Sequence, residues 1–294
     1  MKILVTGASG MLAADVIPEL LKEGHSVVQT DIRKHSKDIN ILDISSYDET
    51  IKNIKDTQPE YVFHFAAETD VDLCEKNPQY AHKVNVLGTE NIVLACREVG
   101  AGLLYVSTAN VFNGEKSEPY VESDEAGSIN VYGRSKYQGE LIVKKHLCRY
   151  FIIRAGWMVG GWELDKKFVY KIIQQLKQGK KNIKAVFDKA GSLTFTKDFA
   201  VNFMDVINTQ HYGLYHMANK GVCSRYDIAV KIVEFMDLKN KVKVFPVESK
   251  EFPLPAPRPR SEMLSNHNLE LLGLNNMPFW ESSLKEYIKI NKDK

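Results

Sequence analysis

The residues of this chain best suited to chemistry are Tyr132 and Lys136, in the segment INVYGRSKYQGEL. Their spacing of four is just over one helical turn. On a helix, the phenol and the ammonium therefore share one face, and each can alter the pKa of the other. Tyrosine and lysine at this spacing are also common on ordinary surface helices. The pair alone therefore does not indicate catalysis, and other motifs in the chain must support that interpretation.

Two hydroxyl groups complete a set that could reduce a carbonyl. LLYVSTANVF predicts a strand that ends at Ser107 and Thr108. Hydride addition to a ketone leaves an alkoxide, which needs a proton and a stabilising donor. Tyrosine has a pKa of about 10, too high for efficient acid catalysis near neutrality, and a nearby cation should lower it. We expect Tyr132 to be the general acid, and Lys136 to tune it and anchor the cofactor ribose. Thr108 is the expected partner of the substrate oxygen, with Ser107 as the alternative.

The N-terminal segment VTGASGMLA predicts a loop that binds a dinucleotide. Gly7 and Gly10 lie between a predicted strand and a predicted helix, where glycine permits a tight turn and close approach to a pyrophosphate. Ala13 stands at the third position of the fingerprint, which tolerates alanine. The expected cofactor contacts in this loop are Gly7, Ser9, Gly10, Met11 and Leu12.

Charged residues after the second predicted strand bear on the choice of cofactor. Asp31 lies where the fingerprint expects an acid that accepts from the ribose 2′-hydroxyl, which favours NADH. Arg33 and Lys34 follow directly and could pair with a 2′-phosphate, which favours NADPH. Both cofactors stay open. The other expected cofactor contacts are Ile32, Arg33, Asp43, Ile44, Phe65, Ala66, Ala67 and Thr69, together with Tyr132 and Lys136.

The elements that must position these residues predict an α/β fold. Apolar runs predict strands in KILVTG, HSVVQTD, YVFHFAA, GLLYVST and FIIRAG, and helical patterns lie between them, around residues 11–24, 46–56 and 78–99. This alternation predicts a Rossmann-type doubly wound parallel sheet with its active site beyond the carboxyl ends of the strands. Pro18, inside the first helical pattern, should bend that helix or remove a hydrogen bond.

The second half of the chain predicts a smaller substrate-binding lobe. We expect residues 1–160 to form the dinucleotide-binding domain, with some later segments returning to it, and residues 161–294 to form mainly the lobe. KKFVYKIIQQLKQGKK and SRYDIAVKIVEFMDLK predict amphipathic helices, while IKAVFD and KVKVFPV predict short strands. FPLPAPRPR, residues 252–260, predicts a rigid loop that borders a cleft.

Composition excludes several classes of function. The 294 residues carry a net charge of +2, which gives no electrostatic case for binding nucleic acid or a membrane surface. The four cysteines lie far apart and predict neither a disulfide framework nor a zinc site, so we expect a reducing, cytoplasmic location. No stretch approaches the roughly 18 apolar residues that span a bilayer. We expect no metal site, and we expect His64 and His216 to be packed in strands.

The motifs together resemble one known family, the extended short-chain dehydrogenase/reductases, over nearly the full length. The resemblance rests on TGASGML, FHFAAETDVDLCE, VNVLGTENI, YVSTANVFNGEKSEPYVESD, NVYGRSKYQGE, IIRAGWMVGG, DKAGSLTFTKDFA, GLYHMAN and PRPRSEML, in the family's order. It implies reduction of the 4-keto group of a nucleotide-linked 6-deoxy sugar, a polysaccharide precursor, with NADPH or NADH as the hydride donor. Thr108, Tyr132 and Lys136 match the family's catalytic triad.

The resemblance also implies substrate contacts, and the chain departs from the family near them. Ala109 and Asn110 replace a usual Asp-Tyr, Leu193 replaces a typical proline, and Lys167 stands where asparagine is preferred. These departures leave open another nucleotide or an N-acetylated sugar. Trp157 could equally be an aromatic residue of an interdomain core, and Arg258 a solvated arginine instead of a diphosphate ligand. The implied substrate contacts are Ser107, Asn110, Val111, Phe112, Trp157 and Arg258.

Other functions are compatible with the same scaffold. A nucleotide-sugar 4,6-dehydratase would need carboxylates directly after Thr108, and Ala109 and Asn110 supply none. A nucleotide-sugar 4-epimerase is harder to exclude, because STANVF is tolerably like its counterpart loop. A non-catalytic subunit, like the regulatory beta subunit of methionine adenosyltransferase, is the third alternative, and the intact triad counts against it. A homodimer is compatible with the sequence, which does not decide the oligomeric state.

Overall fold

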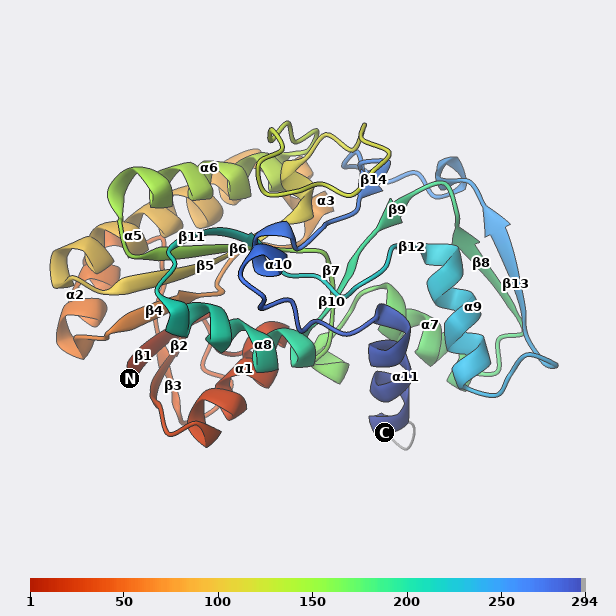
Figure 1. The fold of residues 1–294 in the computed structure, drawn as a ribbon, viewed down its shortest axis with the longest axis horizontal. Coiled ribbons are helices and arrows are strands. Elements are labelled where there is room, and N and C mark those ends of the chain that lie inside the picture. The colour runs from red at the N-terminus through yellow and green to blue at the C-terminus, as the bar shows by residue number, and fades with distance from the viewer. Residues whose placement is uncertain (292–294) are drawn as a thin grey trace.

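Seven short segments pair into one parallel sheet in the computed structural model, which describes residues 1–291 (Figure 1). The strand order is β11 (Gly213–His216), β6 (Tyr150–Ala155), β5 (Gly102–Thr108), β4 (Tyr61–His64), β1 (Lys2–Thr6), β2 (Ser26–Asp31) and β3 (Ile39–Ile41). The five strands predicted in the first half are confirmed, and β11 joins them from far along the chain. The order reverses between β1 and β4, where an open sheet leaves a crevice beyond its carboxyl ends.

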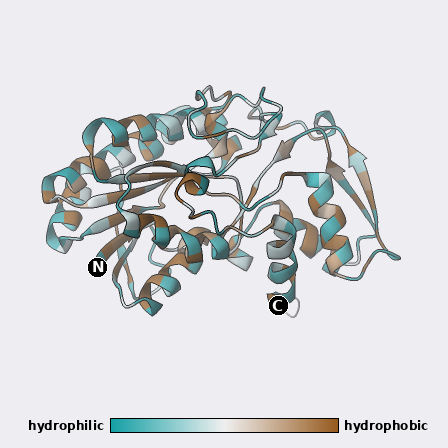
Figure 2. Cartoon of the chain, viewed as in Figure 1, coloured by the Kyte–Doolittle hydropathy of each residue, from teal (hydrophilic) through white to brown (hydrophobic). Residues whose placement is uncertain are grey.

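Helices cover both faces of this sheet (Figure 1). One face carries α2 (Tyr47–Thr57), α5 (Gly88–Val99) and α6 (Val131–His146), and the other carries α1 (Met11–Lys22) and α8 (Thr196–Thr209). Ile3 and Val5 of β1 join the apolar cluster under α1 and α8, whereas Leu4 joins the cluster under α2 and α5. Strands buried on both faces are apolar without alternation, and Figure 2 shows the central strands as mostly hydrophobic. The predicted doubly wound fold is confirmed.

Pro18 is tolerated inside α1 because of the face on which it lies. Proline has no N–H to donate to the carbonyl of the residue four positions earlier, here Ala14. Both Ala14 and Pro18 are exposed, so water can bond to the freed carbonyl. The buried residues of the helix, among them Val16 and Leu20, lie on its other side.

The helical pattern around residues 78–99 is interrupted by a π-helical turn. The structure has α3 (Val71–Lys76), α4 (Pro78–His82) and the π-helix η1 (Lys83–Leu87), which leads directly into α5. Asn77 caps α4 by accepting from the backbone N–H of Tyr80 at 3.1 Å. In η1, Asn85 is fully buried and donates to the Ser135 hydroxyl of α6 at 3.0 Å. The π-turn thus ties this segment to the helix that carries Tyr132.

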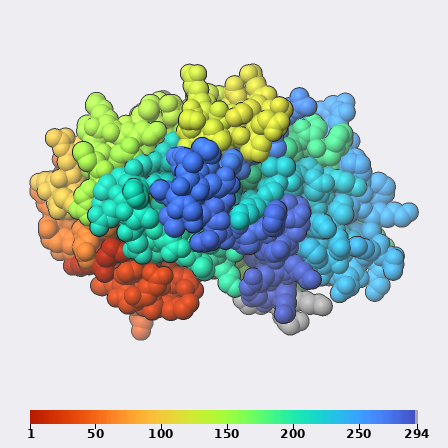
Figure 3. Space-filling model, in the orientation of Figure 1, coloured from red at the N-terminus to blue at the C-terminus, as the bar shows by residue number. Residues whose placement is uncertain are grey.

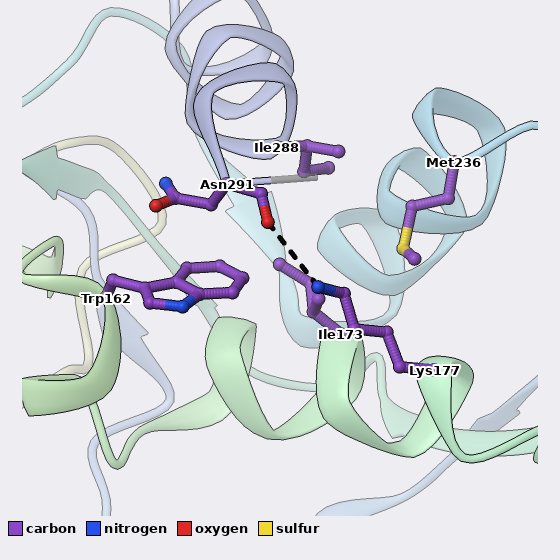
Figure 4. A pocket seen from close by; sticks show the side chains of 6 residues that line it. All are labelled: Trp162, Ile173, Lys177, Met236, Ile288 and Asn291. Atoms are coloured by element: carbon purple, nitrogen blue, oxygen red, sulfur yellow. Dashed lines mark hydrogen bonds between the residues drawn. The ribbon is translucent and has the colours of Figure 1, made fainter. Parts of the chain in front are cut away.

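A second apolar core lies beside the sheet. It packs the predicted helices α7 (Phe168–Lys177) and α9 (Arg225–Phe235) and the predicted strands β8 (Asn182–Val186) and β13 (Lys243–Val247), which pair in parallel. Helix α11 (Trp280–Ile290) closes this core, and a hollow of about 40 Å³ remains between it and α7. Figure 4 shows Lys177 reaching across that hollow to the carbonyl of Asn291, at 3.5 Å, beside the Trp162 ring.

Very short strands join the two cores. β7 (Trp157–Val159) pairs with β10 (Leu193–Phe195), and β9 (Ala190–Gly191) lies between β12 (Cys223–Ser224) and β14 (Ser261–Glu262). In Figure 3 the segment around residues 113–129 (yellow) caps the top of the visible face, directly above the blue segment around α10. A bridge between Tyr120 and Leu264 links those segments. The remaining short helices are η2 (Ala109–Val111), η3 (Trp162–Leu164), η4 (Ser249–Glu251) and α10 (His267–Leu271).

Candidate active site

A cavity of about 1230 Å³ lies beyond the carboxyl ends of β1, β2, β5 and β6 and extends to the second core. Most of the predicted site residues from distant parts of the sequence line this one space. Those that line it are Gly7, Ser9, Gly10, Met11, Leu12, Asp31, Ile32, Arg33, Asp43, Ile44, Phe65, Ala66, Ala67, Thr69, Ser107, Thr108, Asn110, Tyr132, Lys136, Trp157 and Arg258.

Val111 and Phe112 lie outside the cavity, contrary to the role implied for them as substrate contacts. Both side chains are fully buried in a separate apolar cluster behind η2. The Phe112 ring stacks on Tyr120 with centroids 4.0 Å apart, and the Arg154 guanidinium lies over it at 5.0 Å. These residues pack against the loop after Thr108 on the side away from the cavity, so their side chains do not reach a ligand bound there.

The start of α6 is built to hold Tyr132 in place. Asn130 caps the helix by accepting from the backbone N–H of Gly133 at 2.8 Å, and Glu75 accepts from that of Val131 at 2.9 Å. Glycine is needed at position 133 because a Cβ there would lie 2.0 Å from the carbonyl oxygen of Asn110. Helix α6 therefore contacts the loop after β5 closely, which brings Tyr132 beside Thr108.

The pKa values of Tyr132 and Lys136 are both shifted in this structure. Burial raises the pKa of Tyr132 well above its usual value, and the Thr108 hydroxyl opposes that shift. Burial also lowers the pKa of Lys136 to about 7, against the charge of Glu140, which raises it. Burial is the largest cause of both shifts, so in this structure the net shift of the Tyr132 pKa is upward, and the effect expected of Lys136 stays a prediction.

Lys136 is enclosed by an aromatic ring and a buried ion pair. Its Nζ lies over the Tyr105 ring at 4.1 Å, which favours the charged form. Below it on α6, Glu140 accepts from Nε and Nη2 of Arg154 at 2.8 and 2.7 Å. Ser107 donates its hydroxyl to the same carboxylate at 2.6 Å. Because Ser107 already donates to Glu140, Thr108 is the better placed of the two to meet a substrate oxygen.

The turn after β1 has the shape that a dinucleotide requires. Gly7 adopts φ 69°, and a Cβ there would lie 2.7 Å from the backbone nitrogen of Ala66. Gly10 is the N-cap residue of α1 and lines the cavity together with Met11, Leu12 and Ala13, so the first turn of that helix lies at the cavity. Only glycine, which has no Cβ, fits this close to the Ala66 backbone. The residues of the loop therefore fit a bound dinucleotide whose pyrophosphate lies at the helix N-terminus.

Asp31 closes the other side of this turn. One carboxylate oxygen accepts from the backbone N–H and hydroxyl of Ser9, at 3.1 and 2.7 Å, and the other accepts from the N–H of Arg33 at 3.1 Å. The carboxylate is thereby fixed at the edge of the cavity, next to the Arg33 side chain. Asp31 can accept from a ribose hydroxyl and Arg33 can meet a phosphate, so the geometry keeps both cofactors open.

The part of the cavity around Trp157 contains charged residues that the sequence analysis did not single out. Arg225 lies at the start of α9, and its guanidinium stacks on the Trp157 ring at 3.7 Å. Glu262, on β14, accepts from the Asn110 amide at 2.6 Å. Arg258 pairs with Asp72 at 3.0 Å, so its charge is partly satisfied. Arg225 stands in no motif. Glu262 lies within PRPRSEML, but that motif gave it no role, and the pairing of β14 with β9 brings it to the cavity.

The two histidines of the strands are packed groups. His64 bonds to the Thr6 hydroxyl at 2.8 Å and the Thr89 hydroxyl at 3.2 Å, and burial lowers its pKa to about 3. His216 is also fully buried, beside the carbonyls of Tyr120 and Ser265. Within residues 1–291, no group of three or more His, Cys, Asp or Glu side chains could hold a metal ion. Over the same range, no helix has the length and apolar character to cross a membrane.

Comparison with known proteins gives a match over the whole length. The family described as RmlD substrate binding domain matches residues 1–292. Among curated proteins, the spore coat polysaccharide biosynthesis protein SpsK of Bacillus subtilis is 32% identical over 288 residues, which cover 98% of this chain and 97% of that protein.

Solved structures agree with this match. A dTDP-4-dehydrorhamnose reductase from Clostridium acetobutylicum has a TM-score of 0.92 at 37% identity, covering 99% of this chain and 100% of that one. The reductase of the same name from Bacillus anthracis, in complex with NADP, has a TM-score of 0.91 at 34% identity and covers 98% of both chains. A UDP-glucose 4-epimerase from Thermus thermophilus reaches 0.83 at only 20% identity over 97% of both chains, and so shares the fold alone.

Proposed function

The chain belongs to the RmlD substrate binding domain family, and from this premise we propose that it reduces the 4-keto group of a nucleotide-linked 4-keto-6-deoxy sugar with NADPH or NADH. The resemblance to the extended short-chain dehydrogenase/reductases, and within them to dTDP-4-dehydrorhamnose reductase, is confirmed by relatives of that name at 37% and 34% identity. Epimerase structures match below 25% identity, so the reductase is favoured over the 4-epimerase. The same relatives favour it over a regulatory subunit.

One observation carries the proposal. Thr108, Tyr132 and Lys136 line the same cavity as the glycine turn at Gly7 and the Asp31 carboxylate. The sheet brings these five residues together from four separate segments of the chain. A hydroxyl, a phenol and an ammonium beside a dinucleotide turn are the groups that reduction of a carbonyl requires.

The roles of the three side chains follow from their chemistry. A bound reduced nicotinamide cofactor supplies the hydride to C4 of the sugar. Tyr132 gives its phenolic proton to the sugar oxygen, and Thr108 donates a hydrogen bond to that oxygen. Lys136, when protonated, donates to the cofactor ribose, and its charge favours the phenolate that remains after proton transfer. Burial holds the proton on Tyr132 until the more basic alkoxide forms.

A stoichiometric assay tests the proposal. Purified protein is mixed with dTDP-4-dehydrorhamnose and either NADPH or NADH, and cofactor absorbance and sugar products are followed together by spectroscopy and NMR. The proposal predicts one cofactor oxidised for each 4-keto group reduced. An epimerase recycles bound NAD without net oxidation, so sugar conversion with constant absorbance would contradict it. No conversion of any 4-keto-6-deoxy sugar nucleotide, together with a co-purifying partner, would favour the regulatory subunit.

Several finer expectations stay predictions. These are the division of the chain at about residue 160, the roles of individual site residues, the preference between NADPH and NADH, a homodimer, and the cytoplasmic location.

A further inference from the structure

The substrate side of the cavity contains an acid that has few bonding partners. Glu262 is 6% exposed and lines the cavity, and one of its oxygens accepts from the Asn110 amide at 2.6 Å. It forms no ion pair with any of residues 1–291. A carboxylate offers about four acceptor positions, so the Asn110 amide and the Trp157 indole leave about half of them free. A buried carboxylate in this state needs further donors to offset its lost hydration.

A chain of buried amides connects Glu262 with the catalytic helix. The Asn110 oxygen accepts from the side-chain amide of Asn130 at 3.0 Å. Asn130 in turn caps α6 at Gly133, the residue that follows Tyr132, and also donates to the carbonyl of Pro257 at 3.1 Å. Asn110 itself lies two residues after Thr108. The carboxylate is therefore held in a fixed position relative to both Thr108 and Tyr132.

Positively charged side chains lie near Glu262, but none of those in residues 1–291 forms an ion pair with it. Burial raises its pKa, while the Trp157 indole and the charges of Arg225 and Arg258 lower it. Arg258 is paired with Asp72, and Lys189 donates to the carbonyls of Arg258 and Pro259. The Arg225 guanidinium stacks between Trp157 and Phe168, at 3.7 and 5.2 Å, and makes no hydrogen bond to any of residues 1–291. The cavity thus contains an acceptor and a donor that are both available to a ligand.

We propose that Glu262 selects the sugar by accepting a hydrogen bond from a ring hydroxyl, while Arg225 donates to an oxygen of the same ligand. This inference rests on the proposed function and specifies its substrate: the 4-keto sugar keeps a free hydroxyl on the ring, at C2 or C3. A sugar without that hydroxyl leaves the remaining acceptor positions of the carboxylate unpaired, with only Asn110 and Trp157 as donors. Discrimination against such an analogue should be roughly 10- to 100-fold, the value of a hydrogen bond to a charged group.

The test compares dTDP-4-dehydrorhamnose with its 2-deoxy and 3-deoxy analogues. Wild-type protein should favour the parent over one analogue by at least tenfold in kcat/KM. Glu262→Ala should bring the two values within about threefold, and the isosteric Glu262→Gln should give an intermediate ratio. Glu251→Gln is the matched control, since Glu251 ends the short helix η4 before the proline-rich loop, is exposed and pairs with Lys184. It should keep the wild-type ratio.

The inference is tested by the ratio of kcat/KM for the parent sugar to kcat/KM for each deoxy analogue, and not by the absolute rate. A loss of rate that is equal for all three sugars, or a wild-type enzyme that does not discriminate, would overturn the role of Glu262 and leave the reductase intact. Calorimetry with dTDP-rhamnose and its two deoxy analogues gives the same ratio from dissociation constants and needs no turnover. If no cofactor is oxidised, the proposed function fails, while an affinity ratio that Glu262→Ala removes would still support the site. If none of these ligands binds, both fail.

Discussion

Removing the charge of Glu140 tests whether the catalytic helix depends on a buried ion pair. Glu140 is 0% exposed and Arg154 2%, and two hydrogen bonds join them while Ser107 supplies a third. Glu140→Gln keeps the shape but leaves the guanidinium without a counter-charge. Breaking a buried pair in this way costs about 3–5 kcal/mol of unfolding free energy. That is a large part of the roughly 5–15 kcal/mol that keeps a typical domain folded.

Urea unfolding, followed by fluorescence and circular dichroism, measures this cost as a lower midpoint at an unchanged m-value. Adding Arg154→Met to Glu140→Gln removes the orphaned charge, so the double variant should regain at least half of the loss. Glu98→Gln is the matched control, because Glu98 pairs with Lys55 on the surface, and it should cost less than about 1 kcal/mol. A Glu140→Gln loss no larger than this control would refute the reasoning.

Three further predictions concern the cofactor and the catalytic helix. Lys136 loses its proton as the pH rises through about 7, so the affinity for NADH should be highest below that pH and fall roughly tenfold above it. Calorimetry should show this fall, and Lys136→Arg, which stays charged, should remove it; a flat wild-type profile would contradict the assignment. Gly133→Ala places a Cβ 2.0 Å from the Asn110 carbonyl and should cost about 10²-fold in kcat/KM, whereas Gly127→Ala meets an ordinary contact at 3.6 Å and should not. Asp31→Ala should shift the ratio of kcat/KM values towards NADPH, and an unchanged ratio would mean that Asp31 does not bind the ribose.

The sequence predicted the sheet and the glycine turn because both are locally encoded. β1, β2, β4, β5 and β6 are short apolar runs, and Gly7 stands directly after the first of them. The amphipathic patterns of α7 and α9 were equally clear. By contrast, β9, β12 and β14 have two residues each, too few for any pattern to appear. They form only because distant segments meet.

The details of the site depend on such long-range contacts, and here sequence reasoning fell short. Glu262 reaches the cavity through the pairing of β14 with β9, and Arg225 through the packing of α9 against Trp157. The family resemblance implied that Phe112 contacts the substrate, but its ring packs in the cluster around Tyr120. The pKa of Tyr132 depends on how deeply the helix is buried, which the spacing of Tyr132 and Lys136 does not reveal.

The central claim is that Tyr132 supplies the proton to the reduced sugar. The most direct test is the single-turnover rate of NADPH oxidation by Tyr132→Phe, with dTDP-4-dehydrorhamnose and both ligands saturating. The variant lacks only the phenolic hydroxyl, so the rate should fall about 10²- to 10⁴-fold while the dissociation constant for NADPH stays within about twofold. A variant that keeps a rate within a few fold of wild type would contradict the account.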